Sequence, residues 1–145
     1  MTEAACNLVG PATLEAVTGQ PVYTSLWMGQ EDFKIGHIQL ADWADCVLVA
    51  PATADIIAKA ANGICDDLLS TTLCTCWEKK VLLAPAMNTQ MWANPIVQKN
   101  MKILTGELGY QTVGPETGRL ACGTTGPGRM AEVLAIMDAI TILLK

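Results

Sequence analysis

The chain has 145 residues, of which 51% are hydrophobic and 16% charged, and its formal net charge is −5. This length suits one domain with a sizeable core, and the composition excludes a disordered protein. The acidic balance and the lack of a Lys/Arg cluster argue against nucleic acid and anionic membranes as partners. No apolar stretch reaches the roughly eighteen residues that a membrane-spanning helix needs. The low charged fraction favours apolar surface that is covered by other subunits.

Six cysteines are spread along the chain, at positions 6, 46, 65, 74, 76 and 122. Met1 leads into TEAACN rather than into a basic and then an apolar run, so this end carries no signal-peptide pattern. We therefore expect a cytoplasmic protein with reduced thiols. One residue separates Cys74 from Cys76, which is a poor zinc spacing, and the chain has a single histidine. We interpret this pair as core packing and predict no metal site.

Helical and strand-like segments alternate along the chain. In chain order we expect a helix over Pro11–Val17, a helical turn over Ala41–Trp43, a strand over Asp45–Ala50, helices over Ala54–Asn62 and Asp66–Trp77, a strand over Lys80–Ala84, a helix over Asn94–Leu108, a short strand over Gln111–Val113, a glycine-rich loop over Gly114–Gly128 and a last helix over Met130–Leu144. The runs DCVLVA and VLLA are continuously apolar, as in buried parallel strands. Pro51 is expected to end the first of them.

This alternation predicts an α/β fold, a three-layer doubly wound parallel sheet of the Rossmann-like kind with helices on both faces. We expect a single domain over residues 1–145. The first residues, MTEAACNLVGP, look like the end of a strand that passes into a helix, whereas a doubly wound domain normally opens with a whole strand and a turn. We therefore expect that the first strand–helix unit is missing.

Two strands end in matching segments, VAPATAD over Val49–Asp55 and LAPAMN over Leu83–Asn88. Ligands of such sheets bind outside the carboxyl ends of the strands. Proline halts the ladder, the small residues let a ligand approach the backbone, and a helix capped by Thr53 or Asp55 offers N–H donors. Two matching segments predict a shared ligand, and the alternative is two ordinary strand-to-helix turns.

The longer stretch LAPAMNTQMWANP surrounds a polar Asn88 with large apolar side chains. Met87 and Met91 suit the face of a flat, partly apolar ligand. The side-chain amide of Asn88 could hold a carboxylate without protonating it. A role as a helix cap is the structural alternative for Asn88.

Two further residues could carry chemistry. His37 is the only histidine and is the best candidate base near neutral pH, although a lone histidine is often structural. Cys122 lies among glycines in GRLACGTTGPGRM, so it is either a reactive, exposed thiol or a buried, inert one. We expect the loop Gly118–Gly128 to close over a site. Arg119 and Arg129 could bind an anion or simply lie in solvent.

Together, the ordered segments HIQLADWAD, PATADIIAKAANGICDDLLS, PAMNTQMW and LACGTTGPGRMAE closely resemble the flavin-dependent cysteine decarboxylases. The family pattern PxMNxxMW is matched by Pro85, Met87, Asn88, Met91 and Trp92. The resemblance covers nearly the whole chain, and it is strongest to the bacterial branch that serves coenzyme A biosynthesis. In that branch the domain is often fused to a synthetase.

The resemblance implies an FMN cofactor and a small-molecule substrate, N-(4'-phosphopantothenoyl)-L-cysteine, which loses CO₂ after oxidation by the flavin. It implies catalytic roles for His37 as base, Asn88 as carboxylate ligand and Cys122 as proton donor. The implied FMN contacts are Thr2, Ala5, Thr53, Ala54, Asp55, Ile56, Ala86 and Met87. The implied substrate contacts are Asn88, Met91, Arg119 and Ala121. A homotrimer or a trimer-based dodecamer and a fused or separate phosphopantothenate–cysteine ligase are the implied partners.

The chain differs from the family in two places. It lacks the opening strand and glycine-containing turn that help to hold FMN, and it has Asp55 where the family usually has Asn, so two hydrogen-bond donors are lost there. The alternatives are a peptidyl-cysteine decarboxylase of a lantibiotic pathway, a non-catalytic flavin-binding regulatory protein and a fragment without function.

Overall fold

The computed structural model describes residues 1–27 and 36–145. The chain divides into two units. The helical unit comprises Met1–Ala44 and Ile64–Thr75, and the sheet unit comprises Asp45–Gly63 and Cys76–Lys145. Each unit is described by itself.

The helical unit contains α1 (Glu3–Cys6), α2 (Pro11–Thr18), α3 (Gly36–Trp43) and α5 (Leu68–Thr75). Helix α2 confirms the predicted helix and ends at Gly19, whose φ of 65° suits glycine. Helix α3 is longer than the predicted turn. Helix α5 begins two residues later than predicted, because the Asp67 carboxylate accepts a 2.8 Å hydrogen bond from the Ser70 N–H and caps the helix there. Helices α3 and α5 pack against each other.

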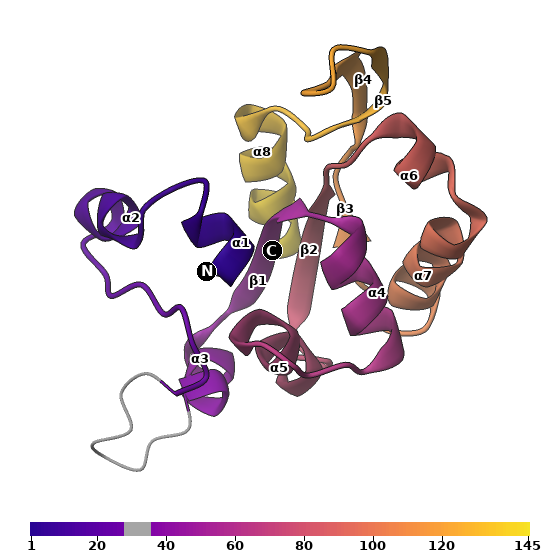
Figure 1. The fold of residues 1–145 in the computed structure, drawn as a ribbon. Helices are drawn as coiled ribbons and strands as arrows, with labels where there is room; N and C mark the ends of the chain where they lie inside the picture. Colours follow the sequence, from indigo (N-terminus) through magenta and orange to yellow (C-terminus); the bar gives the residue numbers. More distant parts are fainter. Residues whose placement is uncertain (28–35) are drawn as a thin grey trace. The chain divides into compact units, whose positions relative to one another are not determined.

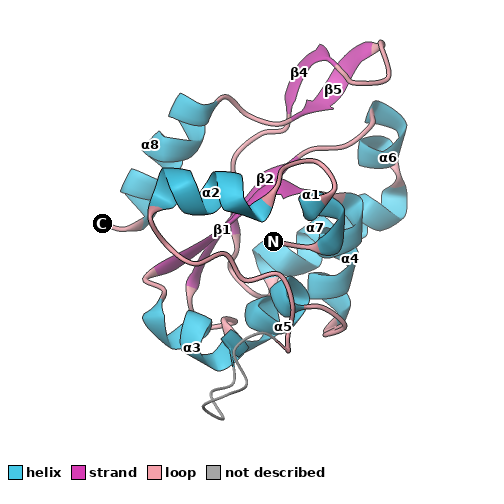
Figure 2. Ribbon diagram, turned by 60° about the vertical axis from the view of Figure 1, so that its left-hand side comes forward, coloured by secondary structure: helices cyan, strands magenta, loops and turns pink. Residues whose placement is uncertain are grey.

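The sheet unit is built on a parallel sheet in the order β1–β2–β3, with β1 at Cys46–Ala52, β2 at Lys80–Pro85 and β3 at Gln111–Thr112. Helices α4 (Ala54–Asn62) and α7 (Pro95–Gly106) cover one face, and α8 (Val133–Leu143) covers the other (Figures 1 and 2). This arrangement confirms the predicted α/β fold with a parallel sheet.

The core of the sheet unit lies on both sides of β2, whose residues Val81–Pro85 are all buried. On the α8 side, Ala84 packs with Ala131 and Ile136. Helix α4 buries Ile56 and Ile57, as its sequence spacing predicts. Helix α7 packs against α4 and buries Val97, Met101 and Leu104 among others. The carboxyl end of β2 is therefore held by packing from both faces.

Strand β1 does not end at Pro51, so that prediction is wrong. The strand continues to Ala52, which is in register with Pro85 of β2. The register shifts between Val49 and Ala52, and such an irregularity accommodates a proline that has no N–H to donate.

The predicted loop over Gly114–Gly128 is also wrong in part, because it forms an antiparallel hairpin of β4 (Glu116–Arg119) and β5 (Thr125–Arg129). The Arg129 guanidinium pairs with Glu116 at 2.7 Å and with Glu132 at 2.8 Å. A Cβ atom at Gly118 would meet Arg129 Nε at 2.7 Å, so glycine makes room for this side chain. Gly118 therefore leaves room for the arginine that pairs with Glu116 across the hairpin.

Sequence reasoning missed α6 (Thr89–Ala93), which precedes α7. Asn88 caps α6, and Asn94 caps α7 by accepting a 2.8 Å hydrogen bond from the Ile96 N–H. The cysteine prediction is half correct: Cys76 is fully buried, as expected of core packing, but Cys74 is exposed. Among the described residues, no helix has the length and apolarity to cross a membrane.

Candidate active site

Asn88 lies immediately after β2, at the carboxyl edge of the sheet. Its Oδ1 accepts a 2.8 Å hydrogen bond from the Gln90 N–H, so the residue does cap α6. This bond determines which end of the amide points into the helix, because only the oxygen can accept. The Nδ2 group is thereby directed away from α6, and it donates to the sulfur of Cys122 at 3.3 Å. The cap and the functional interpretation of Asn88 are therefore compatible.

Cys122 lies at the tip of the β4–β5 hairpin and is exposed, in agreement with the reactive alternative. Its Sγ lies 3.1 Å from the hydroxyl of Thr124 and 3.3 Å from Asn88 Nδ2. Hydrogen bonds from the side chain and then the backbone of Thr124 lower the pKa of the Cys122 thiol below its ordinary value, and Asn88 adds to this shift. Exposure and donors to the sulfur are the conditions under which a cysteine reacts.

The hairpin is joined to the end of β2 by its backbone. The Met87 N–H donates to the Gly128 carbonyl at 2.9 Å. A Cβ atom at Gly128 would collide with the Met87 carbonyl, and Gly128 has a φ of 135° that favours glycine. At Gly126, a Cβ atom would meet the Thr89 hydroxyl of α6 at 2.5 Å. These close approaches place the hairpin tip over Asn88.

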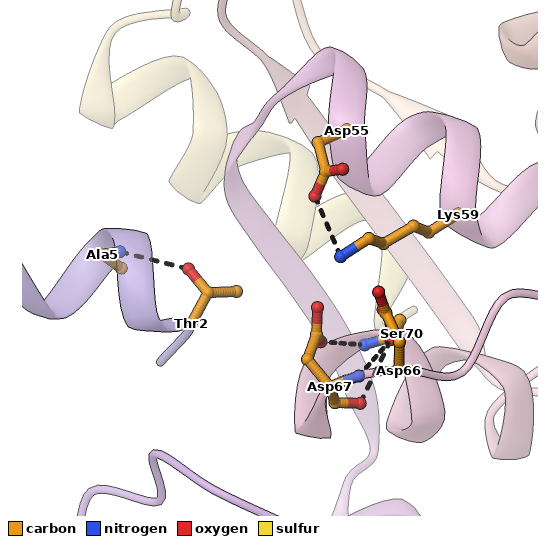
Figure 3. A network of polar contacts seen from close by, with 7 residues as sticks. All are labelled: Thr2, Ala5, Asp55, Lys59, Asp66, Asp67 and Ser70. Atoms are coloured by element: carbon orange, nitrogen blue, oxygen red, sulfur yellow. Dashed lines mark hydrogen bonds and ion pairs between the residues drawn. The ribbon is translucent and has the colours of Figure 1, made fainter.

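The end of β1 is different, because it offers backbone donors rather than reactive side chains. Thr53 is the N-cap of α4, but its side chain makes no capping hydrogen bond. The first N–H groups of a helix have no acceptor within the helix, so those of Ala54, Asp55 and Ile56 are directed toward this edge. The Asp55 carboxylate pairs instead with Lys59 at 3.2 Å (Figure 3). Thr53 is therefore the cap residue, as one of the two predicted alternatives had it, but it caps without a side-chain hydrogen bond.

The backbone donors at the end of β2 are already used. The Ala86 N–H donates to the Ala52 carbonyl at 3.0 Å, and Met87 donates to Gly128. Ala86 and Met87 are both half-buried and lie beside the β1 end that carries the α4 donors. A flat, partly apolar cofactor fits this edge, since one strand end supplies N–H groups and the other supplies small and apolar surface.

The remaining candidates of the sheet unit lie on α4, on α6 and on the hairpin. Met91, on α6, has a side chain exposed over 48% of its surface, whereas Ile56 is buried in the core. Arg119 ends β4, and Ala121 precedes Cys122 at the exposed hairpin tip. Arg129, by contrast, is occupied by two carboxylates and is not available to an anionic ligand in the way the sequence suggested.

Three candidates belong to the helical unit. His37 lies half-buried in the first turn of α3. Thr2 caps α1, where its hydroxyl accepts a 3.2 Å hydrogen bond from the Ala5 N–H (Figure 3). Thr2 and Ala5 thus form one local capping motif. In the described parts of the chain, no group of three or more His, Cys, Asp or Glu side chains is placed to hold a metal ion.

Sequence reasoning missed Thr124 and the glycine contacts that seat the hairpin. Thr124 lies two residues after Cys122, and a tight turn brings two such residues into contact. This spacing is the one sequence feature that could have indicated Thr124. Gly126 contacts α6 and Gly128 contacts Met87. These contacts join segments far apart in sequence, so no local sequence pattern predicts them.

Comparison with known proteins places the chain among flavoproteins. The family described as Flavoprotein matches residues 1–145. The coenzyme A biosynthesis bifunctional protein CoaBC of Vibrio cholerae is 48% identical over 137 residues, which are 94% of this chain and 34% of that protein. The chain thus spans about a third of the length of the curated relatives that it matches.

Two solved structures are similar to the fold. The FMN-dependent cysteine decarboxylase SpaF has a TM-score of 0.83 and 38% identity, covering 99% of this chain and 75% of that one. A PPC decarboxylase mutant complexed with pantothenoylaminoethenethiol has a TM-score of 0.74 and 38% identity, covering 81% of this chain and 64% of that one. With the parallel sheet and the family match over its whole length, the chain belongs to the Flavoprotein family.

Proposed function

We propose that this chain carries out the FMN-dependent decarboxylation of N-(4'-phosphopantothenoyl)-L-cysteine, a carboxy-lyase step of coenzyme A biosynthesis. The observation that carries the proposal is the contact between Asn88 and Cys122 at the carboxyl end of β2. A carboxylate ligand and a thiol acid are what decarboxylation followed by protonation requires. The similarity to CoaBC and to PPC decarboxylase supports the choice of substrate.

FMN would lie along the edge formed by the ends of β1 and β2. The backbone N–H groups at the start of α4 would hold its polar atoms, and Ala86 and Met87 would line its ring system. Bound FMN supplies a two-electron oxidation of the substrate's thiol-bearing carbon, which creates the electron sink for loss of CO₂, and it returns these electrons afterwards.

Each catalytic side chain has a distinct role. Because an amide nitrogen carries two hydrogens, Asn88 can donate to the Cys122 sulfur and to the substrate carboxylate at the same time. Cys122 would deliver a proton after CO₂ has left, and its lowered pKa makes that proton easier to give. His37 would act as the base that helps to activate the substrate thiol, a contribution on the order of 10²–10⁴ in rate. Met91, Ala121 and Arg119 would line the substrate, with Arg119 as an anion partner.

Purification with excess FMN and an assay for CO₂ release would test the proposal. A yellow protein that releases CO₂ from N-phosphopantothenoyl-cysteine is the expected result. Release from cysteine-ending peptides alone would favour the peptidyl-cysteine decarboxylase, and FMN binding without turnover would favour a non-catalytic flavoprotein. His37→Asn is expected to retain FMN and lose product formation.

We further propose a homotrimer, or a larger assembly built from trimers, that works in the cytoplasm. Four large apolar side chains of α8, Val133, Leu134, Met137 and Ile142, are each more than half exposed, which is costly for a monomer. The six cysteines are thiols, in keeping with a reducing compartment. A ligase activity, fused or separate, would supply the substrate, since the CoaBC relatives are bifunctional. Light scattering of the purified chain, compared with Leu134→Glu, tests the assembly.

A further inference from the structure

Two side chains contact the sulfur of Cys122, and they differ in what they can do. The Asn88 amide nitrogen lies 3.3 Å away and can only donate a hydrogen bond. The Thr124 hydroxyl lies 3.1 Å away and can either donate or accept. Thr124 therefore has a suitable hydrogen bond for both protonation states of the sulfur, and Asn88 has one only when the sulfur acts as acceptor.

We propose that Thr124 is a positioning residue for Cys122. The Thr124 hydroxyl holds the Cys122 sulfur beside Asn88 in both the thiol and the thiolate form. The backbone supports this arrangement. The Leu120 N–H donates to the Thr124 carbonyl at 2.9 Å, and the Gly123 N–H donates to the Leu120 carbonyl at 2.9 Å, which closes the hairpin turn. Gly123 has a φ of 87°, a conformation that favours glycine. The turn thus brings the side chains of residues 122 and 124 to the same side of the hairpin tip.

This inference rests on the proposed function and adds a residue to it. When Cys122 protonates the decarboxylated substrate, its S–H bond breaks and the electron pair stays on sulfur. The accepting carbon binds the proton with an electron pair of the enethiolate double bond. Before the transfer, the S–H bond turns from the Thr124 hydroxyl oxygen toward the substrate carbon. After the transfer, the Thr124 hydroxyl rotates and donates to the thiolate, and the hairpin does not need to move.

The charged groups in and beside the hairpin do not supply the hydrogen bonds to the Cys122 sulfur. Glu116, Arg129 and Glu132 are paired with one another at the base of the hairpin. Arg119 ends β4 and is in register with Thr125. The hydrogen bonds to the Cys122 sulfur come from Thr124 and Asn88, which are uncharged. Removal of the Thr124 hydroxyl should therefore change the titration of this thiol directly.

The test measures the rate of Cys122 alkylation by iodoacetamide against pH, by mass spectrometry of the digested full chain. Thr124→Val keeps the shape of the side chain and removes the hydroxyl. We expect its alkylation midpoint to shift to higher pH and its rate at pH 7 to fall several-fold, because the thiolate has lost a donor. Thr124→Ser keeps the hydroxyl and should restore the profile. The neighbouring Thr125→Val is the matched control and should leave the profile unchanged.

An unchanged profile in Thr124→Val, or an equal shift in Thr124→Ser, overturns the inference. Alkylation of Cys74, another exposed cysteine, checks the reagent in every sample. Turnover adds a second readout: Thr124→Val should lower kcat for CO₂ release and leave KM unchanged. If the wild-type chain releases no CO₂ but the alkylation shift is present, the proposed function fails and the role of Thr124 in placing the thiol stands. If the wild-type chain releases CO₂ normally but Thr124→Val shows no alkylation shift, the proposed function stands and the role of Thr124 fails.

Discussion

The ends of β1 and β2 carry the same tripeptide, Ala-Pro-Ala, and lie side by side, yet they present different polar groups. After β1, Thr53 leads directly into α4, and the first N–H groups of that helix are left without a side-chain cap. After β2, the backbone N–H groups of Ala86 and Met87 are already bonded, and the following Asn88 extends a side chain toward Cys122. We propose that the first end holds the cofactor with backbone groups and that the second supplies reactive side chains.

The difference comes from the residues that follow the tripeptide and from what each strand end contacts. Thr-Ala-Asp begins a nine-residue helix at once, whereas Met-Asn-Thr begins a five-residue helix whose cap is also a donor to sulfur. The hairpin contacts the second end through the hydrogen bond between the Met87 N–H and the Gly128 carbonyl. A repeated strand-end motif therefore predicts a shared edge but does not predict a shared role.

The substitution that should separate the two ends most strongly is Asn88→Asp. Its carboxylate would repel the substrate carboxylate by roughly 4 kcal/mol at an effective dielectric constant near 20, which is on the order of a 10³-fold loss in kcat/KM. Aspartate also caps helices well, so the fold should be retained. Asn94→Asp, at the neighbouring helix cap, is the control and should keep its kcat/KM. Steady-state CO₂ release measures both, and equal losses in the two variants would contradict the proposed role of Asn88.

Gly128→Ala should disturb the β2 end through its backbone. The new Cβ atom would collide with the Met87 carbonyl, and the positive φ adds strain, so we expect the free energy of unfolding to fall by roughly 3 kcal/mol. Gly63→Ala, after α4, is the matched control, because Gly63 has a φ of 66° but no atom within 4 Å of the new Cβ. It should cost about 1 kcal/mol, from backbone strain alone. Urea denaturation gives both values, and a similar cost would mean that the hairpin is not seated on Met87.

Removing the side-chain caps compares the two helices that follow the strands. Asn88→Ala deletes the hydrogen bond to the Gln90 N–H and should lower the free energy of unfolding by about 1 kcal/mol. Thr53→Ala should cost only about 0.3 kcal/mol, since the Thr53 side chain makes no capping bond. Thermal unfolding of the two variants under the same conditions measures the difference. If Thr53→Ala costs as much as Asn88→Ala, the distinction between the ends does not hold.

A small effect on stability is also expected for Asp55→Asn. Asp55 is 72% exposed and pairs with Lys59 within one helix, so loss of the pair should cost about 0.5 kcal/mol and less at 1 M salt. The amide would also restore two donors at the start of α4, so FMN should bind more tightly. Fluorescence titration with FMN measures this second effect. Weaker binding in the variant would show that the carboxylate itself contributes to the cofactor site.

Sequence reasoning succeeded where the signals are local. Helix α4 has its predicted bounds because Ile56 and Ile57 share one face and Gly63 adopts the left-handed conformation that ends a helix. It failed at Pro51, because the irregularity that lets β1 continue depends on its pairing with β2. It failed again at the hairpin, which a non-local ion pair between Arg129 and Glu116 stabilises.

The active-site residues follow the same division. Asn88 and Cys122 were each selected from the sequence by residue type, by local context and by resemblance to a family. Their contact joins positions 34 residues apart, and only the folded hairpin creates it. Thr124 could not be predicted because a threonine in a glycine-rich turn does not by itself indicate a function. Its hydroxyl is found beside the Cys122 sulfur only in the folded structure.

The hydrogen bond from the Met87 N–H to the Gly128 carbonyl has a consequence for measurement. An amide proton exchanges with solvent only when its hydrogen bond opens, and this one opens only when the hairpin leaves the end of β2. The Ala86 amide, which bonds to Ala52 inside the sheet, exchanges only when the strands themselves separate. The protection of two adjacent amides therefore reports separately on the docking of the hairpin and on the stability of the sheet. The exchange rate of the Met87 amide measures how often the hairpin, and with it the thiol, moves away from Asn88.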